Sequence, residues 1–317
     1  MGIKSWIACA IILPGIAMAD STQSIRYYVD DDGVQVATTG TATKNDTPFA
    51  IASIGKTMTA VAVLRIVGQG AIDLDGPVTR WVDGDIADGL GGLSGVTVRH
   101  LLNMTSGLPD YLSDAYIEAA LGNPDRFQNP LTALSYAYDE PPVFGVGEGF
   151  DYSNTNYVLL GLILEQATGK SYAETLKSEV FAPANMTNSF VFGSTRLPAN
   201  FPSGHEDGAH YRDYYEHQGF GDGGVIATAP DLAKFYEALF ITGDLLPDAL
   251  LDELLVDPIG EGYGMGIEVE DGLVGHSGGD LGFSSDVRMD TDDGRIAIIF
   301  HANADADTSW TFDKLLN

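Results

Sequence analysis

The feature of this chain that most constrains its fold is an apolar run, Met58–Val67, which follows the tetrapeptide Ser53-Ile-Gly-Lys56 and stops at Gly68 and Gly70. Apolar residues occupy nearly every side of this run, which predicts a helix buried all round. The rest of the chain therefore has to build a core about it. Positions i and i+3 share a helix face, so Lys56 is expected to stand beside Ser53.

A serine and a lysine at the start of a buried helix suit acyl transfer. The first turn of a helix has free backbone N–H groups and a positive dipole end. A serine there can lose its proton to a neighbouring base, which is what a nucleophile requires. The Ser53–Lys56 spacing also occurs by chance in many chains, so its interpretation depends on the other residues.

Composition excludes several classes of function. The chain has 317 residues, enough for one or two lobes around a sizeable core, and a hydrophobic content of 44% argues against disorder. Lys and Arg number 16 against 45 Asp and Glu, which gives a net charge of −29. The negative electrostatic field of a chain with this net charge disfavours nucleic acid and anionic membranes as partners. We expect most of the acidic residues to lie on the solvated surface of the protein.

The N-terminus has the pattern of a secretory signal peptide over residues 1–19. Lys4 precedes an apolar stretch from Trp6 to Ile16, and Ala17-Met18-Ala19 is a small-residue cleavage site. The stretch is too short to span a bilayer comfortably, so no membrane anchor is expected beyond it. We expect cleavage after Ala19 and a secreted or periplasmic protein. The single cysteine, Cys9, would be removed, leaving neither a disulfide nor a thiol nucleophile.

Strand patterns lie near both ends of the chain and helical patterns lie between them. Residues 25–29 and 34–39 flank an Asp-Asp-Asp-Gly turn, and further strand patterns cover residues 263–269, 273–276, 284–289 and 295–301. This order predicts an α/β (α+β) fold: an antiparallel sheet built from both chain ends and flanked by helices, with an inserted all-helical lobe. The predicted sheet domain comprises residues 20–79 and 225–317, and the helical domain residues 80–224.

Two further clusters carry groups that could serve Ser53. Tyr152 and Asn154 precede a helical pattern, and His276-Ser-Gly-Gly279 follows a strand pattern. A nearby Lys56 ammonium is expected to lower the pKa of Tyr152, and Asn154 could bind Lys56 and a substrate amide. Each cluster also has a plainer interpretation: an aromatic core residue, a helix cap, and a strand that leads into a loop.

Together, in this order, the three clusters resemble the penicillin-recognising serine hydrolases: class C β-lactamases, D-alanyl-D-alanine carboxypeptidases, D-aminopeptidases and β-lactamase-like esterases. The S-x-x-K motif of this family falls on Ser53 and Lys56, its Y-x-N motif on Tyr152 and Asn154, and its K-T-G or H-x-G motif on residues 276–278. Segments 97–108, 152–161 and 223–232 extend the resemblance over nearly the whole chain after residue 19. It implies a β-lactamase/transpeptidase-like fold.

The resemblance also implies roles for these residues. Ser53 would attack a carbonyl, with Lys56 and Tyr152 together as the general base. The backbone N–H groups of Ser53 and Gly279 would form the oxyanion hole. No metal or cofactor is implied, and the partner is a small-molecule or peptide substrate. The residues implied in substrate binding are Asn154, His276, Ser277 and Gly278.

One position departs from the β-lactamase pattern. His276 stands where those enzymes have a lysine, and a histidine is mostly neutral near pH 7. A permanent cation for a substrate carboxylate is then missing, which favours a D-amino-acid peptidase or carboxypeptidase. A carboxylesterase or β-lactamase on the same scaffold is the alternative, and a penicillin-binding, slowly deacylating cell-wall module is another. The sequence does not indicate the oligomeric state.

Rival sites are weaker. His205-Glu206 and His210 faintly suggest the zinc motif H-E-x-x-H, but the histidines are five residues apart and would not share a helix face. The chain contains no G-x-S-x-G nucleophile elbow and no phosphate loop of the G-x-x-x-x-G-K type.

Overall fold

A computed structural model describes residues 23–40, 43–123, 129–217 and 219–316. The predicted signal peptide, residues 1–19, lies outside the described residues and stays a prediction. Among the residues that are described, no helix combines the length and the apolar character needed to cross a membrane.

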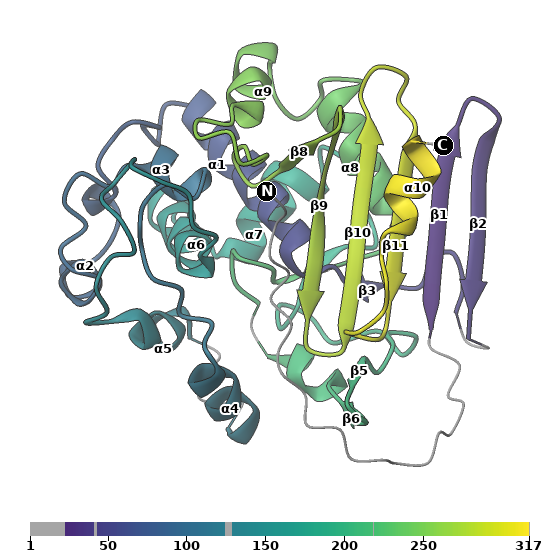
Figure 1. The fold of residues 1–317 in the computed structure, drawn as a ribbon, viewed down its shortest axis with the longest axis horizontal. Coiled ribbons are helices and arrows are strands. Elements are labelled where there is room, and N and C mark those ends of the chain that lie inside the picture. Colours follow the sequence, from purple (N-terminus) through teal and green to yellow (C-terminus); the bar gives the residue numbers. More distant parts are fainter. Residues whose placement is uncertain (1–22, 41–42, 124–128, 218, 317) are drawn as a thin grey trace.

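The main sheet joins strands from both ends of the chain. Six antiparallel strands run in the order β2-β1-β11-β10-β9-β8 (Figure 1). Their bounds are β1 (Ser24–Asp30), β2 (Gly33–Thr39), β8 (Glu268–Glu270), β9 (Leu273–Asp280), β10 (Phe283–Asp290) and β11 (Ile296–His301). The predicted Asp-Asp-Asp-Gly turn joins β1 to β2, and a second Asp-rich turn joins β10 to β11. The expected antiparallel sheet assembled from both ends, with helices beside it, is confirmed.

Helices lie on both faces of this sheet. The C-terminal helix α10 packs on one face, and α8 packs on the other (Figure 1). Side chains alternate along β11 accordingly: Ala297 faces a small cluster under α10, whereas Ile298 and Phe300 face the main core. The helices of the sheet region are α1 (Gly55–Gly68), α8 (Ala229–Phe240), α9 (Asp248–Leu255) and α10 (Trp310–Leu316).

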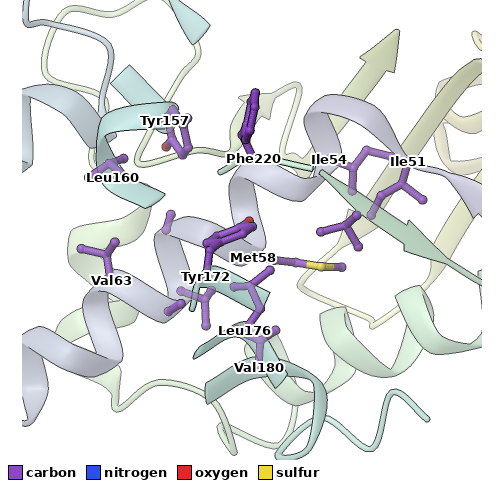
Figure 2. Packing of buried hydrophobic residues seen from close by; sticks show 14 of the residues in the cluster. Ile51, Ile54, Met58, Val63, Tyr157, Leu160, Tyr172, Leu176, Val180 and Phe220 are labelled. Carbon is purple, nitrogen blue, oxygen red and sulfur yellow. The ribbon is translucent and has the colours of Figure 1, made fainter. Parts of the chain in front are cut away.

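Helix α1 is at the centre of the main core, as its apolar sequence predicted. Nearly all of its residues from Gly55 to Ile66 are buried. Figure 2 shows Tyr157 and Leu160 on one side of α1 and Tyr172, Leu176 and Val180 on another. Burial of each large aliphatic side chain contributes about 1.5–3 kcal/mol, so this packing holds the start of α1 firmly in place.

The segment between the two parts of the sheet is mainly helical. Its helices are α2 (Gly84–Gly89), α3 (Val98–Leu102), α4 (Asp114–Gly122), α5 (Pro130–Leu134), α6 (Asn154–Thr168) and α7 (Tyr172–Leu176). Thr97 caps α3, and the left-handed Gly169 ends α6.

The prediction of an all-helical insert is wrong in one respect. Residues 80–224 also contain short strands. One of them, at residues 190–191, pairs with residues 225–227, which in turn pair with residues 49–50 shortly before Ser53. These short strands are β3 (Phe49–Ala50), β4 (Phe190–Val191), β5 (His205–Glu206), β6 (Ala209–His210) and β7 (Val225–Ala227).

Candidate active site

Ser53 lies in a tight turn that leads into α1. After β3 the chain forms a 3₁₀ turn, Ala52–Ile54, and continues directly as α1. Ala52 has a φ of +48°, a left-handed conformation that residues with a side chain rarely adopt. Such local strain is often found at functional positions. Ser53 is half-buried and lines a cavity of about 400 Å³.

Lys56 stands beside Ser53, as the spacing predicted. Its Nζ lies 3.0 Å from the Ser53 Oγ and 2.7 Å from the Asn154 Oδ1, and it also donates to the backbone carbonyl of Asp222. The side chain is completely buried. Burial lowers the pKa of Lys56 to about 8, although the carboxylates of Asp222, Asp110 and Asp280 act in the opposite direction. A neutral amine is therefore accessible near neutral pH, and it can accept the Ser53 proton.

Tyr152 lines the same cavity, but its acidity differs from our expectation. Burial raises the pKa of Tyr152 well above 10, and only the Ser53 side chain acts noticeably to lower it. The expected lowering of this pKa is wrong, because burial outweighs any effect of Lys56, whose Nζ lies over the ring, 5.0 Å from its centroid. The buried Tyr152 hydroxyl has no hydrogen-bond partner among the described residues. It is a protonated donor that faces the reaction site.

Asn154 is held in place by a carboxylate. Its side-chain amide donates to the Asp110 Oδ2 (2.9 Å), and its backbone N–H donates to the Asp110 Oδ1 (3.0 Å). This bond fixes the amide orientation, so that the Asn154 Oδ1 accepts from Lys56. The alternative of a helix cap does not apply, because α6 begins at Asn154 and Ser153 occupies the cap position.

The third cluster lies within a strand rather than at its end. Strand β9 continues through the glycines to Asp280, because β10 pairs with it along its whole length. Beyond Gly275, β8 no longer pairs with the other edge of β9. The Ser277 N–H points to that edge, where it donates to Glu268, and the Gly279 N–H two residues on points the same way. Gly279 lines the Ser53 cavity.

His276 does not face this cavity, in contrast to the substrate contact that we expected. Its ring is only 1% exposed. The Nε2 pairs with the Tyr263 hydroxyl (3.1 Å), and the Nδ1 donates to the Ser277 carbonyl. Burial lowers the pKa of His276 to about 4 although the Glu268 carboxylate raises it. The ring is therefore neutral at pH 7, and it packs beside the Tyr152 ring, with the centroids 6.2 Å apart, without lining the cavity itself.

Ser277 and Gly278 also lie outside the cavity lining. The exposed Ser277 hydroxyl donates to Glu268 (2.8 Å). Glu268 is in turn bound by Arg288, a buried cation that also pairs with Asp286 (2.9 Å). Burial works to raise the pKa of Glu268, but His276 and Arg288 outweigh it and lower the pKa to about 2. Glu268 therefore stays ionised and anchors this part of β9.

Comparison with known proteins places the chain in a family. A family model described as Beta-lactamase matches residues 4–315. The chain belongs to the Beta-lactamase family. Among curated members, penicillin-binding protein 4* of Bacillus subtilis (strain 168) is 31% identical over 300 residues, 84% of this chain and 63% of that protein. Esterase EstB of Burkholderia gladioli is 30% identical over 260 residues, 70% of this chain and 64% of the esterase.

The chain thus spans slightly less than two thirds of the length of these two relatives. One solved structure matches over a larger share of both chains. The D-stereospecific amidohydrolase from Streptomyces sp. superimposes with a TM-score of 0.80 at 27% identity, over 93% of each chain. The β-lactamase/transpeptidase-like fold that the motifs implied is therefore the observed one.

Several residues around the family motifs were not predicted. The Asp222 carbonyl accepts from Lys56, Asp110 orients Asn154, and Glu268 anchors β9. Only Asp222 had a usable signal, because it lies within the run Gly219-Phe-Gly-Asp-Gly-Gly224. A Cβ on Gly221 would lie 2.2 Å from the Tyr157 carbonyl, so this run needs glycine to pass close to α6 and reach Lys56.

Nothing in the described part of the chain forms a metal centre. His205 and His210 lie opposite each other on the β5–β6 hairpin, with ring centroids 6.2 Å apart. No group of three or more His, Cys, Asp or Glu side chains that could hold a metal ion occurs among the described residues.

Proposed function

We propose that this protein is a serine hydrolase that forms an acyl-enzyme on Ser53 and cleaves amides of D-amino acids or short D-peptides. The observation that carries the proposal is the contact of 3.0 Å between the Lys56 Nζ and the Ser53 Oγ, with burial lowering the pKa of Lys56 to about 8. A nucleophile and a base with an accessible neutral form are thereby in hydrogen-bond contact.

In the proposed first half-reaction, the Ser53 Oγ attacks the substrate carbonyl carbon, and its proton passes to neutral Lys56. The backbone N–H groups of Ser53 and Gly279 stabilise the oxyanion. The carbon–nitrogen bond then breaks, and the leaving amine takes a proton from the Tyr152 hydroxyl, which Lys56 replenishes. The high pKa of Tyr152 suits this role because the phenol keeps its proton until the amine needs it. In the second half-reaction, water adds to the acyl-enzyme carbonyl, the bond from the acyl carbon to the Ser53 Oγ breaks, the carboxylic acid leaves, and a proton from the water restores the Ser53 hydroxyl.

The choice of bond rests on two observations. The D-stereospecific amidohydrolase from Streptomyces sp. shares the fold over nearly the whole of both chains. Neutral His276 stands where a β-lactamase would carry a lysine cation, so an anionic β-lactam loses a charge-assisted contact worth about 1.5–3 kcal/mol.

We therefore expect D-amino-acid amides and small esters to have a kcat/KM at least about tenfold above that of the cephalosporin nitrocefin. The measurement is a panel of steady-state assays on one enzyme preparation. The proposal is wrong if nitrocefin has the highest kcat/KM of the panel.

Two relatives favour specific alternatives that the same panel separates. Esterase EstB makes a carboxylesterase the second candidate, and this requires esters to react while D-amides do not. Penicillin-binding protein 4* favours a module that acylates and barely turns over. A fluorescent penicillin adduct that persists for hours without product would support that module.

The base role of Lys56 predicts a pH dependence. Protonated Lys56 cannot accept the Ser53 proton, so kcat/KM for an ester without titratable groups should rise with pH and level off above the Lys56 pKa of about 8. Tyr152 cannot cause this rise, because burial raises its pKa well above 10. A profile that stays flat from about pH 6 to 9.5 would rule out Lys56 as the base.

A further inference from the structure

The cavity beside Ser53 has an acidic end formed by Asp222 and Asp280. Both residues line the cavity of about 400 Å³ into which Ser53 opens. Each residue is directly linked to a proposed catalytic group. The Asp222 carbonyl accepts a hydrogen bond from Lys56, and Asp280 follows Gly279 in β9. A substrate acyl group bound at Ser53 therefore lies within reach of both carboxylates.

Hydrogen bonds hold both carboxylates in place, but no basic side chain among the described residues pairs with either of them. The Asp222 Oδ2 accepts a hydrogen bond from the Tyr111 hydroxyl (2.6 Å), and the Asp280 Oδ1 accepts one from the Leu281 N–H (2.8 Å). Neither carboxylate forms a salt bridge with any residue that the structure describes. Burial, together with the charge of Asp222, raises the pKa of Asp280 to about 6, so Asp280 is largely ionised at pH 7. Burial also raises the pKa of Asp222, whereas Lys56 and the Tyr111 hydroxyl act to lower it.

Carboxyl groups therefore outnumber the lysine at this end of the cavity. Lys56 supplies one cation, and three carboxylates act on it: Asp222, Asp110 and Asp280. Asp110 is already used to hold Asn154. Partly buried like charges are costly unless a cation joins them, and here the open side is the substrate cavity. A carboxylate in the substrate would be repelled there, whereas an ammonium would be attracted.

Two further features of the cavity point to a ligand of this kind. The Tyr152 hydroxyl is buried without a hydrogen-bond partner and lines the same cavity, which leaves it open to a substrate atom. Four aromatic side chains also line the cavity, beside Leu112 and His217, and suit an apolar substituent and a nearby cation. They belong to Tyr111, Phe192, Tyr214 and Phe220.

We propose that Asp222 and Asp280 bind the free ammonium group of an amino-acid amide or ester, next to the carbonyl that Ser53 attacks. The inference rests on the proposed function and deepens it, because it selects a substrate with a free N-terminus over one with a free carboxylate. The enzyme is then an amidase or aminopeptidase rather than a carboxypeptidase.

The test compares two substrates that differ only in the amino group: the p-nitroanilides of D-phenylalanine and of 3-phenylpropanoic acid. At pH 7 the first is largely an ammonium, since α-amino groups titrate near pH 7.7–8.0. In the wild type we expect kcat/KM to be about 10–150-fold higher for the amine, the range of a hydrogen bond to a charged group. Asp280→Asn and Asp222→Asn should each lower this ratio at least about tenfold.

A matched control removes the same charge elsewhere. Asp292→Asn lies in the exposed turn between β10 and β11 and should keep the wild-type ratio within about threefold. A thermal unfolding curve shows that each variant is folded, and we expect Asp280→Asn to unfold at the same or a higher temperature than the wild type, because it relieves repulsion by Asp222.

Binding separates this inference from the proposed function. With Ser53→Ala, which cannot acylate, calorimetry measures the Kd of D-phenylalaninamide against 3-phenylpropanamide. The inference holds if the amine binds at least about tenfold more tightly and the preference disappears in Asp280→Asn, and equal Kd values overturn it. Turnover of neither anilide by the wild type, with tight binding of the amine, would instead overturn the proposed amide hydrolysis.

Discussion

Replacing Ser53 by alanine is expected to lower kcat by about 10⁴–10⁶-fold on every substrate that the wild type hydrolyses, the loss seen when a serine nucleophile is removed. The fold should persist, because Ser53 is half-buried and its neighbours Ala52 and Ile54 carry the packing. Intact-protein mass spectrometry with an acylating substrate provides a second readout. The wild type should gain the mass of the acyl group, and Ser53→Ala should not.

The control for this experiment is another serine. Ser135 is exposed and its hydroxyl donates to the Thr132 carbonyl, outside the cavity lining, so Ser135→Ala should keep kcat within about threefold of the wild type. If Ser53→Ala retains full activity or still forms the acyl adduct, the acyl-enzyme assignment fails. The amide preference and the ammonium pocket would then lose their basis as well.

Ser53 and Lys56 could be placed from the sequence because their relation is local. An i, i+3 spacing on a helix fixes which side chains are neighbours, and the apolar run from Met58 to Val67 shows that this helix is buried. The hairpin between β1 and β2 was equally accessible, since Asp30 and Gly33 mark the turn between two strand patterns. Each of these features depends on residues within one or two turns of chain.

The rest of the site depends on contacts between distant segments. Lys56 meets Asn154 and the Asp222 carbonyl only because α6 and the glycine-rich run pack against α1. No local pattern around Asp110 or Glu268 indicates that these carboxylates hold Asn154 and β9. Pairing with β10 likewise extends β9 through two glycines, which by themselves suggest a strand end.

The inward orientation of His276 has the same origin. Side chains alternate along β9, so the pairing register places the His276 ring on the buried face, between Tyr263 and Glu268. A motif comparison identifies residue 276 as part of the site, but it does not indicate on which face of β9 the side chain lies. The pKa of Tyr152 was likewise out of reach, because it depends on how completely the ring is buried.

Replacing Gly278 by alanine is the second change with a large expected effect. A Cβ at this position would lie 2.5 Å from the Ile51 carbonyl and 2.4 Å from the Ser285 Oγ. Ile51 leads directly into the turn that carries Ser53, so the added methyl group must push β9 away from that turn. The Gly279 N–H then moves away from Ser53. We expect kcat to fall by about 10²–10³-fold, the loss of one oxyanion donor, and stability to fall by about 1–3 kcal/mol.

Kinetic comparison of matched variants tests whether the spacing between β9 and this turn sets the rate. Gly84→Ala adds a methyl group at an exposed glycine where, among the described residues, no other segment of the chain comes within 4 Å of the added Cβ, so it should leave kcat within about threefold. Adding Ser285→Ala to Gly278→Ala removes the contact with the Oγ but not the contact with the Ile51 carbonyl, so it should restore only part of kcat. If Gly278→Ala alone keeps kcat near the wild-type value, the close approach of β9 to Ile51 does not position the oxyanion hole.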